Sequence, residues 1–156
     1  MFARLACAAA LLLAGLSSAS AINVVFAGGG FVTAATAECS DEVIFQGVYV
    51  TVGYFPANQG DNGGDTNLTI GTLPQLGSPF ATHLSFPGVP TGAFVRAKGT
   101  TVSALARTYN ARVDIGEKPT VEADTQNLVL TIKVKNLNGV DGCDATINVA
   151  LRRAPF

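Results

Sequence analysis

The stretch Cys143–Arg152, which reads CDATINVALR, decides the fold class. Every second position in it is apolar, namely Cys143, Ala145, Ile147, Val149 and Leu151. A side-chain period of two is that of a β-strand with one buried face and one solvent-facing face. The phase of the pattern also places Cys143 on the buried face.

The same period recurs along the chain. Asn127–Lys135 and Thr108–Ile115 alternate in this way, and a long strand that begins near Val43 carries Val48, Val50, Val52 and Tyr54 on one face. We expect shorter strands at residues 22–26, 31–39, 66–70, 80–86 and 93–98. Turn-forming residues separate these runs, among them Gly28–Gly30, which we interpret as a flexible turn.

These elements predict an all-β fold. We expect one antiparallel β-sandwich of about seven to nine short strands, with a small β-barrel as the alternative. Charged residues such as Arg112, Lys133 and Arg152 occupy the faces opposite the apolar ones. They argue against an outer-membrane barrel, whose outward face is apolar, unless its lumen holds these charges.

Residues Met1–Ala21 predict a cleavable signal peptide. A short positively charged start precedes the apolar run Leu5–Leu16, and Ala19–Ala21 provides a small-x-small cleavage site. The apolar run is shorter than the about 20 residues of a spanning helix. We therefore expect residues 22–156 to form the mature domain, with no membrane span, in a secreted, periplasmic or cell-surface location.

Cysteine usage agrees with export. Cys7 lies within the predicted leader, so the mature chain keeps Cys39 and Cys143. In an oxidising compartment two cysteines are most simply joined in one disulfide. Such a bridge would link an early part of the domain to a late one.

Charge limits the classes of partner. The whole chain has a formal net charge of −1, and the loss of Arg4 with the leader makes it −2. A domain with a small net negative charge lacks the electrostatic pattern of a nucleic-acid-binding protein. A protein or a carbohydrate is the expected partner, and self-assembly is a further option.

No catalytic or cofactor-binding signature is found. His83 is the one histidine, and neither a second histidine nor a C-x-x-C motif accompanies it, as a zinc site usually requires. The G-x-S-x-G motif of many serine hydrolases is absent. Gly28–Gly30 is not followed by the helix pattern of a dinucleotide-binding unit. We expect no cofactor and assign no catalytic residue.

The loop Gln59–Asn67 is the best ligand candidate in the sequence. Asp61, Asp65 and Asn67 supply oxygen atoms of the kind that calcium prefers, but their spacing does not fit an EF-hand. Asp, Asn and Gly are equally the residues of an ordinary hairpin loop, and this is our preferred interpretation. Tyr54, beside this loop, is interpreted as closing the core.

The sequence thus favours an exported, non-enzymatic binding or structural protein of the envelope or cell surface. Its contacts are expected on the loop Asn58–Asn67 and the turn region Pro87–Gly92, because rigid sheets usually present function on loops. One alternative is an assembly subunit that donates Ile22–Phe26 to a neighbour's sheet edge. Another is a small secreted hydrolase that uses His83 or a pair of carboxylates.

Overall fold

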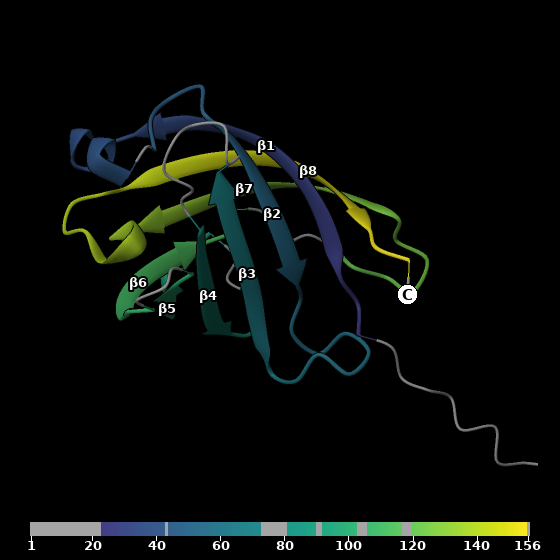
Figure 1. Ribbon diagram of the computed structural model, residues 1–156. Helices are drawn as coiled ribbons and strands as arrows, with labels where there is room; N and C mark the ends of the chain where they lie inside the picture. The colour runs from purple at the N-terminus through teal and green to yellow at the C-terminus, as the bar shows by residue number, and fades with distance from the viewer. Residues whose placement is uncertain are drawn as a thin grey trace, which may run out of the picture.

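Eight antiparallel strands close into a barrel (Figure 1). The computed structural model describes residues 23–42, 44–72, 81–89, 92–102, 106–116 and 120–155. The strands are β1 (Phe26–Ala35), β2 (Tyr49–Phe55), β3 (Asp65–Thr72), β4 (Ala81–Pro87), β5 (Val95–Thr101), β6 (Thr108–Asp114), β7 (Asn127–Lys135) and β8 (Ala145–Arg153). Two short 3-10 helices accompany them, η1 (Ala37–Glu42) and η3 (Leu137–Gly139). Within the described ranges no helix has the length and apolar character needed to cross a membrane.

The prediction of a sandwich is wrong, and its alternative, a small barrel, is confirmed. Each strand pairs with the next, and β8 returns to pair with β1 from Phe26↔Arg153 to Ala35↔Ala145. Alternating burial is the same in a sandwich and in a barrel, because both bury one face of every strand. The pairing of the first strand with the last distinguishes the two folds, and no local pattern records it.

Gly28–Gly30 is not a turn, because β1 continues without interruption through these glycines. The register sets Gly28 between Val52 and Leu151, and Gly30 between Val50 and Val149. A Cβ atom at Gly28 or Gly30 would overlap a carbonyl oxygen of β8. The bounds of the strands expected at residues 22–26 and 31–39 are therefore wrong. A single strand, β1, runs from Phe26 to Ala35, residues 23–25 precede it without being part of a strand, and residues 37–39 belong to η1. The missing side chains of the glycines let β1 lie close to β8. Ile22 lies outside the described residues.

The inward faces of the strands fill the barrel. Rows of side chains cross it in register, such as Tyr54, Leu68 and Leu84 on β2, β3 and β4. These residues are fully buried, as are Phe26, Ile70, Phe86, Val113, Ile132 and Ile147. An eight-stranded barrel is just wide enough for its side chains to fill it, or to hold one small ligand.

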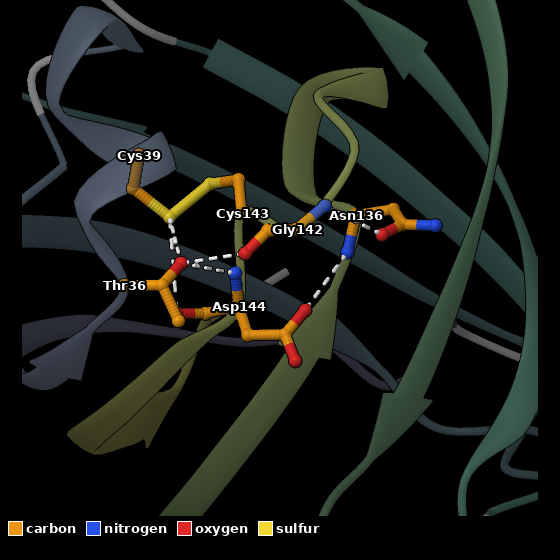
Figure 2. Close-up of a disulfide and its surroundings, with 6 residues drawn as sticks. All are labelled: Thr36, Cys39, Asn136, Gly142, Cys143 and Asp144. Atoms are coloured by element: carbon orange, nitrogen blue, oxygen red, sulfur yellow. Dashed lines mark hydrogen bonds between the residues drawn. A yellow bond between two sulfur atoms is a disulfide. The ribbon is translucent and has the colours of Figure 1, made fainter.

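The two ends of the barrel differ. At one end, here called the cystine end, Cys39 of η1 and Cys143 lie with their sulfur atoms at the bonding distance of 2.11 Å, as the sequence predicts (Figure 2). Buried Ile44 and Leu137 pack with the pair and close this end. At the opposite end, the loop end, β2, β4 and β6 finish and their connections to β3, β5 and β7 begin.

Thr36 joins the two halves of the cystine end (Figure 2). Its hydroxyl group donates a hydrogen bond to the carbonyl oxygen of Gly142 at 2.6 Å and accepts one from the amide of Asp144 at 3.0 Å. The amide of Thr36 donates to the carbonyl oxygen of Asp144 at 3.0 Å. The segment before η1 is thus bonded directly to the start of β8.

Candidate functional site

A cavity of about 440 Å³ lies at the loop end. Its lining residues come from the end of β2, from the β2–β3 connection and from two other connections: Tyr54, Pro56, Ala57, Asn58, Gln59, Val89, Thr120 and Val121. The volume is within the range of about 300–1,000 Å³ that is typical of small-molecule sites. None of these lining residues is ionisable at neutral pH, so the cavity suits an uncharged ligand.

Hydrogen bonds fix the loops around this cavity. The amide of Asn58 donates to the carbonyl oxygen of Gly63 at 2.8 Å, which closes the β2–β3 connection on itself. The side-chain amide of Asn62 donates to the carbonyl oxygens of Val24, at 2.7 Å, and Pro56, at 3.0 Å. Figure 1 shows this connection beside the start of β1. These hydrogen bonds hold the β2–β3 connection in place beside the cavity.

Thr66 ties the β2–β3 connection to the next loop. Its hydroxyl group accepts the amide hydrogen of Ala57 at 3.0 Å and donates to the carbonyl oxygen of Gly88 at 2.5 Å. Ala57 and Val89, the neighbour of Gly88, both line the cavity. One buried hydroxyl group thus positions two of its walls.

Tyr54 is the exceptional residue of the lining. Its side chain is 0% exposed, and its hydroxyl group has no hydrogen-bond partner among the described residues. Burial raises the pKa of Tyr54 well above its ordinary value, because the charged phenolate would be poorly solvated there. The side chain is therefore a neutral hydroxyl group able to donate one hydrogen bond.

Other buried hydroxyl groups of the barrel are partnered. Thr82 bonds to the hydroxyl of Tyr109, and Thr101 accepts the amide hydrogen of Arg107 at 2.9 Å. Thr66 makes the two bonds given above. A buried hydroxyl group without a hydrogen-bond partner lowers the stability of the folded chain by about 1–3 kcal/mol. Tyr54 carries this cost, whereas the partnered threonines do not.

The calcium candidates lie together at another, more open cavity of the loop end, with a volume of about 470 Å³. Asp61, Asp65 and Asn67 line it with Asn23 and Phe55. The two aspartates are exposed, and the side-chain amide of Asn67 approaches the backbone carbonyl oxygen of Asp65 at 3.5 Å. No group of three or more His, Cys, Asp or Glu side chains is gathered for a metal ion in the described ranges.

His83 lies on the outer face of β4. Its Nδ1 atom is 3.4 Å from the hydroxyl oxygen of Thr69 on β3, and the register sets it opposite Thr100 on β5. Its cross-strand neighbours are thus threonines. No carboxylate or serine is brought to it by these pairings.

The segment expected to donate a strand packs against its own chain. Val24 and Val25 are buried, and the carbonyl oxygen of Val25 accepts the amide hydrogen of Ala154 at 2.9 Å. Phe26 begins β1, which has β2 on one side and β8 on the other. Both edges of β1 are therefore occupied within this chain.

Only some of the residues that line the cavity beside Tyr54 were predicted from the sequence. The predicted contact regions include Asn58, Gln59 and Val89, but Thr120 and Val121 carried no signal. The alternation of Thr108–Ile115 predicts that Asp114 faces solvent, but its side chain is buried. It accepts the amide hydrogens of Gly92 at 3.1 Å and Gly116 at 2.8 Å, and so holds two loops at this end.

Comparisons with protein-family models, with curated proteins and with solved structures give no significant match to this chain.

Proposed function

We propose that this chain is an exported, non-enzymatic binding protein that holds a small, uncharged ligand at the loop end of its barrel. The observation that carries the proposal is the buried, unpartnered hydroxyl group of Tyr54 beside a cavity with fixed walls. Buried polar groups are nearly always hydrogen-bonded in proteins, so an exception at a cavity points to a ligand as the partner.

The chemistry of the cavity defines the class of ligand. Pro56, Ala57, Val89 and Val121 offer apolar contact, and the Tyr54 hydroxyl donates to a carbonyl or ether oxygen. Asn58, Gln59 and Thr120 supply further polar atoms. A mainly apolar molecule with an oxygen acceptor, such as a small ketone, ester or amide, satisfies this arrangement.

Export is the second part of the proposal. It is supported by the leader pattern of Met1–Ala21 and by the cysteine pair Cys39 and Cys143, which suits an oxidising compartment. A non-enzymatic role is supported by the surroundings of His83, whose paired neighbours are threonines.

Titration with a fluorescent ketone tests ligand binding. The probe is 6-propionyl-2-(dimethylamino)naphthalene, which is uncharged and changes its emission in an apolar site. We expect saturable binding to the mature chain. Tyr54→Phe, which removes only the hydroxyl group, should weaken binding about tenfold, because one buried hydrogen bond to the ligand is lost.

Tyr49→Phe is the matched control, because Tyr49 is a half-exposed tyrosine on the outer face of the same strand. It should bind the probe as the unaltered chain does. A mature chain that binds neither the ketone nor any member of a set of small esters and amides would refute the proposed function. Equal affinities of Tyr54→Phe and the unaltered chain would refute the role of the hydroxyl group.

A further inference from the structure

Three cations stand in register across the outer wall of β5, β6 and β7. Arg96 pairs with Arg112, and Arg112 pairs on its other side with Lys135. We call these three residues the cationic row. Adjacent strands lie about 4.8 Å apart, so the row extends over about 10 Å around the barrel. Exposed Lys98 lies two positions from Arg96 on the same face.

The three adjacent positive charges of the row destabilise the sheet. Like charges directly opposite on neighbouring strands repel each other, whereas natural cross-strand pairs usually combine opposite charges. Arg96, Lys98 and Arg112 form no ion pair with any described residue. Lys135 is the exception, since its Nζ atom lies 3.6 Å from a carboxylate oxygen of Asp144. The row therefore has an energetic cost that the fold itself does not require.

Phe94 orders two members of the row. The guanidinium carbon of Arg112 lies 5.9 Å from the centre of its ring, and Nζ of Lys135 lies 5.0 Å from the same centre. Cations at such distances are attracted to the face of an aromatic ring. Both long side chains are thus held against one ring, which reduces the entropy lost when an anion binds them.

We propose that the cationic row binds an acidic polysaccharide, through carboxylate or sulfate groups carried on successive sugars. Guanidinium groups form paired hydrogen bonds with such anions, and a line of cations matches a chain that carries anions at intervals. The row follows the curved wall of the barrel, where a flexible polymer stays in contact along its length. This surface is separate from the cavity beside Tyr54 and does not depend on the ligand proposed for it.

Two other polyanions fit the surface less well. A membrane-binding face combines cations with exposed apolar side chains, but the large exposed apolar residues of the described chain belong to other positions: Phe31, Phe45, Tyr49, Val102 and Val129. A nucleic acid is disfavoured because proteins that bind it present an extended positive field, whereas the cationic row covers only about 10 Å.

The test is binding of the mature chain to immobilised polygalacturonate at low ionic strength. We expect saturable binding that weakens as salt is added, because exposed charges are screened. Arg96→Gln with Arg112→Gln should lower the affinity about tenfold, the effect of removing two exposed contacts of roughly 0.7 kcal/mol each. The matched control, Arg107→Gln with Arg152→Gln, removes two exposed arginines elsewhere and should retain the affinity.

Stability provides a second measurement. Because like-charge repulsion is relieved, the Arg96→Gln, Arg112→Gln double variant should unfold at the same or a higher urea concentration than the unaltered chain. Equal losses of affinity in both double variants, or no loss in either, would overturn the proposal. So would tighter binding to phosphatidylglycerol vesicles or to a single-stranded oligonucleotide than to polygalacturonate.

Discussion

At the residue scale, the hydroxyl group of Tyr54 couples the fold to its proposed ligand. The ring fills the barrel beside Phe26, with the two ring centres 6.4 Å apart, so the aromatic part of the side chain contributes to the core. Only the oxygen atom lacks a partner. A phenylalanine at position 54 would satisfy the core equally well, which is why the tyrosine is more informative about binding than about folding.

Tyr54 also predicts how the protein responds to alkali. An unfolded tyrosine ionises near its ordinary pKa of 10.0, whereas burial raises the pKa in the folded chain. Below pH 10 both states are neutral at this residue and its stabilising contribution is fully present. As the pH rises above 10, only the unfolded state ionises, and the free energy of unfolding falls by up to about 1.4 kcal/mol per pH unit.

Urea unfolding between pH 8 and about 11 measures this effect. Tyr54→Phe should lose stability less steeply with pH than the unaltered chain, since it has no buried hydroxyl group to ionise. Identical pH slopes for the two proteins would show that Tyr54 is not the buried tyrosine described here.

The inward position of Tyr54 was predictable from its sequence phase, but its missing partner was not. Its phase with Val48, Val50 and Val52 indicates a core residue, and the structure agrees. The residue, however, also lines a cavity built partly by Thr120 and Val121, far along the chain. Hydrogen-bond partners from distant loops leave no periodic signal.

At the scale of elements, the strands with strict alternation were the most predictable. The strand expected at Asn127–Lys135 has the same bounds as β7, because each residue of it is either buried in the barrel or turned to solvent. The glycines of β1 were wrongly predicted as a turn, and the error has a physical reason. Glycine is the commonest turn residue, yet here its missing side chain allows the close approach of β1 to β8.

Gly30→Ala tests that explanation. A Cβ atom at this position would overlap the carbonyl oxygen of Asn148 and lie 2.7 Å from the Cα atom of Val149. Because both are backbone atoms, β1 and β8 would have to separate, and we expect a loss of about 1–3 kcal/mol in the free energy of unfolding.

Gly63→Ala is the matched control, since a Cβ atom at Gly63 has no neighbour within 4 Å. It should change the stability by less than about 0.5 kcal/mol. Urea unfolding of the two variants gives the comparison. A Gly30→Ala protein as stable as the control would mean that β1 does not need glycine to close the barrel.

At the scale of the whole molecule, closure of the barrel depends on contacts between its two ends in sequence. β1 pairs with β8 along nearly its full length, and the cysteine pair joins the segment after β1 to the segment before β8. The strand pairing and the cysteine pair both connect the beginning of the domain to its end. The predicted disulfide indicated that an early part of the domain lies beside a late part, as in a barrel. A sandwich with a bridge between early and late strands fits the same cysteine spacing, so the disulfide alone could not decide between the two folds.

Removal of this bridge should strongly destabilise the folded chain. Cys39 and Cys143 are separated by 104 residues, and in the loop-entropy model a cross-link of this span stabilises the folded chain by about 4–5 kcal/mol. We expect Cys39→Ala with Cys143→Ala to lose most of that amount in urea unfolding, and reductant to lower the unaltered chain to a similar stability. Because Thr36 still bonds to Gly142 and Asp144, the variant should keep its barrel below the transition, with an unchanged far-ultraviolet spectrum. If the oxidised and reduced forms unfold at the same urea concentration, the sulfur link does not stabilise barrel closure. The pairing of β1 with β8 would then be sufficient by itself.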